Sequence, residues 1–198
     1  MDYIKKYFTE VMRIAELIDK DQINKLIGEL KEIKKNQGRL FFLGVGGGAA
    51  NASHAVNDFR KICGFEAYTP MDNISELSAR VNDEGWESIF ANWLRGSQLC
   101  AKDGVFVFSV GGGNKEKNIS SNLVEALKYA KEAGAKIFGI VGRDGGHTAK
   151  VADACVIVPP INSKTITPHT ESFQAVVWHL IISHPGMKVS EMKWESIK

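Results

Sequence analysis

Cysteine is scarce in this sequence, and its spacing excludes two common uses of the residue. The 198 residues include only Cys63, Cys100 and Cys155, which lie far apart. An odd number of cysteines argues against a disulfide framework, and the lack of a CxxC pair argues against a cysteine zinc site. We therefore expect reduced and mostly buried thiols, as in the cytoplasm.

Long apolar runs and an excess of one charge are missing as well. No stretch approaches the roughly 18 apolar residues of a membrane span, and residues 1–6 carry charge where a secretory signal needs an apolar core. The formal net charge is +2, without a marked basic run, which is too balanced to indicate nucleic-acid binding. These absences predict a cytoplasmic protein that binds neither membranes nor nucleic acid.

Hydrophobic periodicity predicts helices at the start of the chain. In residues 2–37, apolar side chains recur at helical spacing in two groups, separated by a turn at 19–22 and closed by Gly38. We expect an amphipathic helical pair. Its place before the first strand favours packing against another subunit.

Strand and helix patterns alternate in the rest of the chain. Short apolar runs at 40–43, 105–108, 137–141 and 155–158, with a weaker one near 66–69, are typical of strands buried on both faces. Helical patterns separate them, including one apolar stripe from Trp86 to Leu94 and another at 123–130. The alternation predicts a three-layer α/β/α fold with a five-stranded parallel sheet. We expect one domain over 1–198, comprising N-terminal helices (1–37), an α/β core (38–184) and a C-terminal tail (185–198).

Two of the predicted strands end in glycine clusters, at residues 44–50 and 109–114. In an open parallel sheet, ligands bind beyond the carboxyl ends of the strands, where the strand order reverses. Glycine lets the backbone approach an anion, and the following helix N-terminus supplies free N–H groups. The pattern therefore favours a phosphate site, with tight turns that bind nothing as the alternative. Neither loop has the spacing of a nucleotide-binding motif.

His54 and Asp58 follow the first glycine loop on a predicted helix. Because they are four residues apart, they share one helix face. That spacing suits a shared metal ion or a base beside a substrate carbon. An ordinary surface pair is the alternative.

A second polar group lies on the last predicted helix. We expect Thr167 to be its N-cap, with Pro168 in the first position. Glu171 and His179 are eight residues apart, about 12 Å of helix rise. A straight helix brings both to one ion only if the side chains lean or a neighbouring subunit contributes. Taken alone, His179 in its apolar surroundings is more typical of a core histidine than of a ligand.

Taken together, these segments resemble the phosphoheptose isomerases of the sugar-isomerase (SIS) domain superfamily over residues 2–184. The family's first loop, with its Gly-x-Gly-Gly-Ser-Ala-Ala pattern and a helical His and Glu, matches residues 44–58, where Asp58 replaces the Glu. The Ser-Thr-Ser-Gly loop matches residues 109–112, and the closing helix matches with Glu171 in place of Gln. A further family segment matches Asp72, Ser75, Leu77, Ser78, Asn82, Asp83 and Gly85.

The resemblance implies a flavodoxin-like strand order and a homotetramer with its sites between subunits. It also implies an aldose–ketose isomerase that converts sedoheptulose 7-phosphate to glycero-manno-heptose 7-phosphate for surface polysaccharide. Asp58 would be the base and His179 its acid/base partner. Zn²⁺ would be held by His54, Asp58, Glu171 and His179, which leaves open how Asp58 serves as both base and ligand. The implied substrate- and phosphate-binding residues are Gly46, Gly47, Gly48, Asn51, Asp83, Ser109, Gly111, Gly112, Ser120, Thr167 and Glu171.

Several hydroxyl groups of the family pattern are missing. Gly48 stands where the first loop usually has serine, and Val110 and Gly111 replace two hydroxyl residues of the second loop. Lys115 and Lys117 are candidates to supply charge instead. These departures leave a second hypothesis, a non-catalytic sugar-phosphate-binding or adaptor protein of the same fold.

Overall fold

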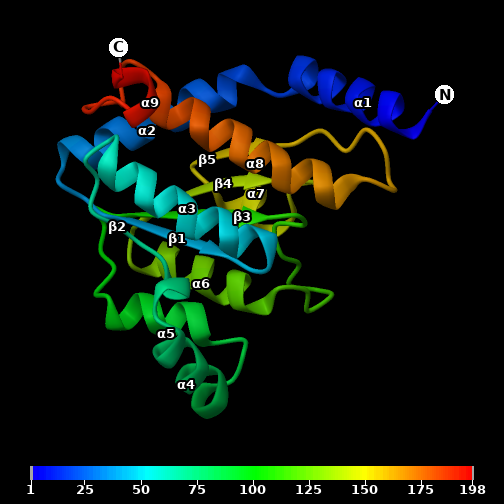
Figure 1. Ribbon diagram of the computed structural model, residues 1–198. Helices are drawn as coiled ribbons and strands as arrows, with labels where there is room; N and C mark the ends of the chain where they lie inside the picture. The colour runs from blue at the N-terminus through cyan, green and yellow to red at the C-terminus, as the bar shows by residue number, and fades with distance from the viewer. Residues whose placement is uncertain (1, 198) are drawn as a thin grey trace.

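The centre of the molecule is a five-stranded sheet (Figure 1), described here for residues 2–197 from a computed structural model. All neighbouring strands are parallel, in the order β2-β1-β3-β4-β5. The strands are β1 (Leu40–Gly44), β2 (Ala67–Tyr68), β3 (Gly104–Ser109), β4 (Lys136–Val141) and β5 (Ala154–Ile157). The predicted flavodoxin-like order is confirmed. The direction of the strand order reverses between β1 and β3. The carboxyl ends of these two strands therefore flank the expected ligand crevice.

Helices cover both faces of the sheet. One face packs against α2 (Lys20–Lys35), α3 (Gly47–Lys61) and α8 (Ile166–Ser183), and the other against α5 (Ile89–Gly96), α6 (Ser121–Glu132) and α7 (Gly146–Val151). Successive strand side chains alternate between the two cores: Phe42 and Phe106 face the first, Phe41 and Val105 the second. The three-layer α/β/α architecture is confirmed.

The N-terminal helix α1 (Tyr3–Leu17) extends away from the sheet along the start of α8 (Figure 1). Its buried residues are Glu10 and Ile14. Ile4, Phe8 and Met12, at four-residue intervals, form a second apolar stripe that remains 61–63% exposed. We call these three residues the α1 stripe. The predicted helical pair is present, and its turn is shorter than expected because Asp19 caps α2 directly through the N–H groups of Asp21 and Gln22.

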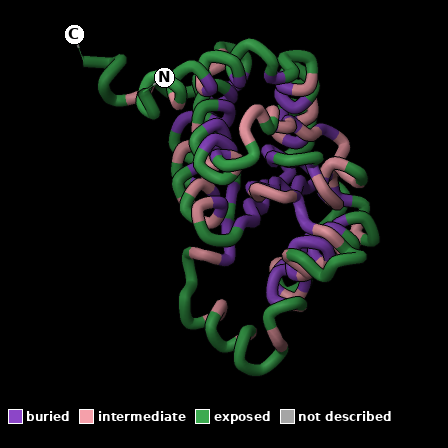
Figure 2. The backbone as a smooth tube through the Cα atoms, turned by 90° about the vertical axis from the view of Figure 1, so that its right-hand side faces the viewer, coloured by how far each residue is buried: buried purple, intermediate pink, exposed green. Residues whose placement is uncertain are grey.

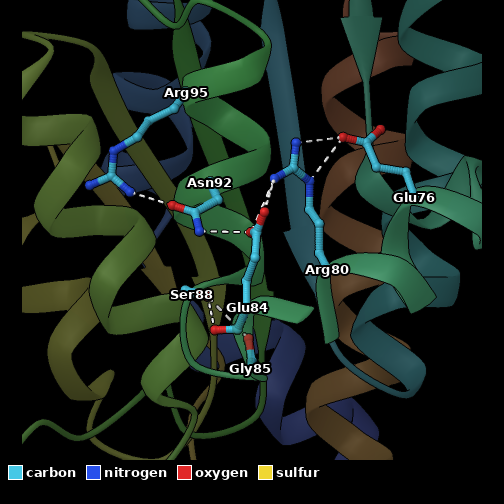
Figure 3. A network of polar contacts seen from close by, with 7 residues as sticks. All are labelled: Glu76, Arg80, Glu84, Gly85, Ser88, Asn92 and Arg95. Atoms are coloured by element: carbon cyan, nitrogen blue, oxygen red, sulfur yellow. Dashed lines mark hydrogen bonds and ion pairs between the residues drawn. The ribbon is translucent and has the colours of Figure 1, made fainter. Parts of the chain in front are cut away.

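Helix α4 (Ile74–Glu84), which follows the short helix η1 (Pro70–Asp72), is held by polar contacts and by the partly buried Leu77, which packs against the second core. No residue of α4 is buried, and Figure 2 shows it as the exposed end of the molecule. Arg80 lies between Glu76 (2.8 Å) and Glu84 (3.1 Å), and Glu84 accepts a hydrogen bond from Asn92 on α5 (2.7 Å; Figure 3).

Some boundaries differ from those expected. Helix α8 begins at Ile166 with Thr165 as its N-cap, so Thr167 lies inside the first turn. Trp86 precedes α5 and is not part of its buried stripe. Cys100 is exposed, which differs from the buried position expected for most of the thiols. All three cysteines are free thiols.

The C-terminal tail packs through the buried Met187 and ends in α9 (Lys193–Ser196). Among residues 2–197, no helix combines the length and apolar composition needed to cross a bilayer.

Candidate active site

A cavity of about 400 Å³ lies at the carboxyl ends of β1 and β3, where the strand order reverses. The two glycine loops meet there because β1 and β3 are direct neighbours, with Gly44 opposite Phe108. The first loop contributes Val45 and Gly48 to the wall. The second loop and the start of α6 contribute Ser109, Val110, Gly111, Gly113, Asn114, Ser120 and Leu123. We call this cavity the loop pocket.

Close backbone contacts explain two of the glycines. A Cβ atom on Gly48 would lie 2.4 Å from the carbonyl oxygen of Phe108, and one on Gly112 would lie 2.0 Å from that of Gly145. Gly112 also has a φ of +67°, in the left-handed region that favours glycine. The Ser109 hydroxyl accepts a hydrogen bond from the Gly112 N–H (3.0 Å) and keeps its own proton to donate. These contacts bring the second loop close to the first and to the loop after β4.

Three charged residues line the loop pocket: Lys117, Arg143 and Asp144. Lys117 lies in a small closed loop, where Asn114 and Ile119 form an antiparallel bridge and the Asn114 side chain accepts from the Lys117 N–H (2.8 Å). The Asp144 carboxylate accepts from the Gly146 N–H (3.2 Å). Two cationic residues and one carboxylate leave the wall with a net positive charge, which suits an anion.

Lys115 belongs to a different surface. It lines a groove over α6 and α7 together with His147. Burial, followed by the charges of Lys115 and Lys150, lowers the pKa of His147, so this imidazole is neutral at neutral pH. Of the two lysines expected near the phosphate, the structure brings only Lys117 to the loop pocket.

A second constellation forms where α3 and α8 lie side by side (Figure 1). The side chains of His54, Asp58 and His179 converge, with one potential ligand atom from each residue and all three atoms within 4.8 Å of one another. The Asp58 Oδ2 atom lies 3.5 Å from His54 Nε2 and 4.0 Å from His179 Nε2. The side chain of Asp58 is 14% exposed, whereas those of His54 and His179 are 58% and 45% exposed, so a small molecule can reach the histidines. We call these residues the His–Asp–His cluster.

Hydrogen bonding orients His179 for use as a ligand or base. Its Nδ1 atom lies 2.7 Å from the Ala175 carbonyl oxygen, which can only accept, so Nδ1 carries the proton and Nε2 presents a lone pair to the cluster. Metal-binding histidines usually have this kind of support. The rings also pack together, with the buried Trp178 4.8 Å from His54 between ring centres. His179 is therefore an exposed cluster residue and not a core histidine.

Glu171 lies apart from this cluster, two turns earlier on α8. Its carboxylate rests on Gly47, where a Cβ atom would come within 2.4–2.6 Å of it. Asn51 Nδ2 donates to the Glu171 carbonyl oxygen (3.1 Å) and to Gln174 Oε1 (3.0 Å). Within one chain, three of the four expected metal ligands come together, and Glu171 instead occupies the N-terminus of α3, a favourable place for a carboxylate.

Other expected substrate residues lie elsewhere. Asp83 is exposed on α4, where its carboxylate accepts from Asn82 (2.7 Å). Thr167 is exposed in the first turn of α8. Gly46 is the exposed N-cap of α3.

Comparisons with known proteins agree with this architecture. Residues 3–142 match the SIS domain family. The chain is 31% identical to the phosphoheptose isomerase of Nitratiruptor sp. over 157 residues, which cover 77% of this chain and 78% of that protein. The chain belongs to the phosphoheptose isomerase family of SIS-domain proteins.

Two further members of the phosphoheptose isomerase family match over almost the whole chain. That of Aneurinibacillus thermoaerophilus is 28% identical over 207 residues, covering 100% of this chain and 99% of the relative. The structure of the phosphoheptose isomerase from Neisseria gonorrhoeae has a TM-score of 0.76 at 24% identity, covering 90% of this chain and 94% of that one. This structural similarity confirms the fold.

Arg143 and Asp144 are pocket residues that the family pattern did not point to. They follow β4, in a third glycine-containing turn formed by Gly142, Gly145 and Gly146. The first two loops were identified as candidate phosphate sites because each has a glycine cluster directly after a predicted strand. The same criterion applied to residues 142–146 would have included Arg143.

Proposed function

We propose that this member of the phosphoheptose isomerase family converts sedoheptulose 7-phosphate to glycero-manno-heptose 7-phosphate. One relationship carries the proposal: the loop pocket and the His–Asp–His cluster lie along the same helix, α3. Gly48 lines the pocket, and His54 follows six residues later, about 9 Å along the helix axis. A seven-carbon sugar phosphate can place its phosphate in the pocket and its other end at the cluster.

The loop pocket binds the phosphate in this proposal. Ser109 and Ser120 donate hydroxyl groups, and the N-terminus of α6 directs its positive end toward it. Binding the phosphate at one end fixes the position of the carbonyl at the other, which converts binding energy into orientation of the reacting carbons.

The His–Asp–His cluster moves the protons. Asp58 removes a proton from C1 of the ketose while His179, in its imidazolium form, donates the Nε2 proton to the C2 carbonyl oxygen, which gives an enediol. Asp58 then returns its proton to C2, and His179 Nε2 accepts the proton of the C1 hydroxyl as the aldehyde forms. The 4.0 Å separation between Asp58 and His179 lets one pair of groups serve two adjacent carbons.

The donor set of the cluster fits Zn²⁺. Two imidazole nitrogens and one carboxylate are the ligands of a typical catalytic zinc site with one open position. His54, Asp58 and His179 would hold the ion, and a bound ion would polarise the substrate carbonyl as a Lewis acid in place of proton donation by His179. His179 already has the tautomer that such coordination needs.

A homotetramer is part of the proposal. The α1 stripe is apolar, exposed and unused within the chain, and a second copy can cover it. We propose a cytoplasmic location, where sugar phosphates are metabolised.

Incubating the purified protein with sedoheptulose 7-phosphate and following the aldose product tests the proposal. The assay is run with Zn²⁺ and with a chelator, and the control is sedoheptulose without phosphate, which should not react. Product formation supports the isomerase. Binding of the phosphorylated sugar without turnover in either condition would instead favour a sugar-phosphate-binding protein of the same fold.

A further inference from the structure

The Arg143 side chain, which lines the loop pocket, has no polar partner. Most other arginines of the chain are engaged: Arg39 pairs with Asp103, and Arg80 pairs with two glutamates. Among the described residues, no hydrogen bond or ion pair involves the Arg143 guanidinium group. Five N–H donors are therefore free at the wall of a polar cavity.

The backbone of Arg143 is also unusual. Its φ of +53° lies in the left-handed region, where a residue with a Cβ atom is disfavoured and glycine is the natural choice. Three glycines occur within the same five-residue turn, at positions 142, 145 and 146. Strained residues gather at ligand sites, and a second residue of the loop pocket, Ser120, has the same backbone conformation with a φ of +50°.

Gly111 lies next to this side chain. It occupies a position where the family pattern has a hydroxyl residue, and a Cβ atom there would lie 3.7 Å from Arg143 Cδ. The second loop therefore lacks a hydroxyl group at the point of the wall where the Arg143 side chain approaches it. Lys117 lies in the same wall, on the closed loop 114–119.

We propose that Arg143, with Lys117, binds the phosphate group of the substrate in the loop pocket. This inference rests on the proposed function and deepens it. Charge then replaces the hydroxyl donors that Val110 and Gly111 cannot supply. Guanidinium and phosphate form two parallel charge-assisted hydrogen bonds, which are stronger than bonds from neutral hydroxyls. Asp144 offsets one of the two positive charges.

Binding of inorganic phosphate and of sedoheptulose 7-phosphate, each measured by titration calorimetry, tests the assignment. Arg143→Gln should weaken both ligands about tenfold or more, and Lys117→Gln should weaken them less. The affinity of the unaltered protein should fall steeply as salt is added, and that of Arg143→Gln should fall less. Asp144→Asn should bind phosphate more tightly.

Lys115→Gln is the matched control, because it removes the same charge from the same loop but outside the loop pocket. It should change neither affinity by more than about twofold. Arg143→Gly distinguishes a loss of phosphate binding from a loss of folding stability. It relieves the left-handed backbone, so its melting temperature should equal or exceed that of the unaltered protein while its phosphate affinity falls.

The outcomes distinguish this assignment from the proposed function. Unchanged phosphate affinity in Arg143→Gln, in a protein that still isomerises the sugar, overturns the role of Arg143 alone. Phosphate binding that depends on Arg143 without isomerisation upholds the role and overturns the enzyme. An unaltered protein that binds neither ligand overturns both.

Discussion

Glu10 on α1 and His169 on α8 lie 2.9 Å apart, between Oε2 and Nε2, in a buried contact. The same carboxylate accepts hydrogen bonds from Asn162 (2.7 Å) and Thr165 (3.0 Å), and Tyr7 packs against the His169 ring. This is the main polar attachment of α1 to the rest of the chain. The Thr165 hydroxyl donates to Glu10 and makes no side-chain cap bond to α8.

Replacing Glu10 should make the protein less stable and less sensitive to acid. The hydrogen bond from His169, followed by that from Asn162, lowers the pKa of Glu10 below its ordinary value of 4.5. The carboxylate therefore contributes stability that is fully present above pH 4.5 and is lost as the pH falls through the lower folded-state pKa. Glu10→Gln should unfold at lower denaturant concentration at pH 7, with a smaller further loss on acidification. Equal acid sensitivity of the two proteins would contradict this.

Asp58 should be essential for turnover. Asp58→Asn keeps the size of the side chain and its place between the two histidines but removes the base, so kcat should fall about 10²- to 10⁴-fold. Affinity for inorganic phosphate should be unchanged, because Asp58 lies outside the loop pocket. Asp21→Asn, the same chemical change at an exposed site on α2, is the control and should leave kcat unaltered. Steady-state kinetics of both variants provide the comparison.

The sheet and the two loops could be predicted because local signals define them. β1 and β3 read as continuous apolar runs that end at glycine or serine, and residues buried on both faces require that pattern. Parallel strands then place their carboxyl ends together. The approach of His54 to Asp58 also follows from spacing alone.

Long-range partners could not be predicted in the same way. Nothing near Glu171 in the sequence indicates that its carboxylate lies on Gly47, more than a hundred residues earlier. Thr167 precedes Pro168 and so was the predicted N-cap, and no local signal shows that α8 begins at Ile166, where Thr165 contacts Glu10. The contacts of Arg80 with Glu76 and Glu84 follow from their spacing on α4, but the hydrogen bond from Asn92 on α5 to Glu84 does not.

Zinc content should separate the cluster from Glu171. His54→Ala and His179→Ala each remove a ligand and should weaken zinc binding by more than about 100-fold. Loss of a residue that only hydrogen-bonds to a metal ligand typically weakens metal binding by up to about 100-fold. Glu171→Gln should retain the metal, since its carboxylate is not in the cluster. Elemental analysis after dialysis against a weak chelator measures this. Loss of zinc in Glu171→Gln would mean that Glu171, from the same or a neighbouring chain, is a ligand.

The α1 stripe should govern assembly. Phe8→Glu places a charge at its centre and should shift the protein from the proposed tetramer toward smaller species, as measured by light scattering on a sizing column. Thr9→Glu adds the same charge to the adjacent polar side of the helix and should leave the mass unchanged. Equal masses for the unaltered protein and Phe8→Glu would show that the stripe has no part in assembly.

Restoring the family's serine at position 48 should harm this protein. A Cβ atom on Gly48 would lie 2.4 Å from the Phe108 carbonyl oxygen, which belongs to the backbone of a central strand and cannot move aside cheaply. Gly48→Ser should therefore lower the free energy of unfolding by about 1–3 kcal/mol without improving phosphate affinity. Gly111→Ser is the matched variant on the second loop, where the nearest atom is the flexible Arg143 Cδ at 3.7 Å, and it should change stability by less than about 0.5 kcal/mol. Urea unfolding of both variants tests whether close backbone packing explains why the first loop has glycine in place of serine. A Gly48→Ser protein as stable as the unaltered one would remove that explanation.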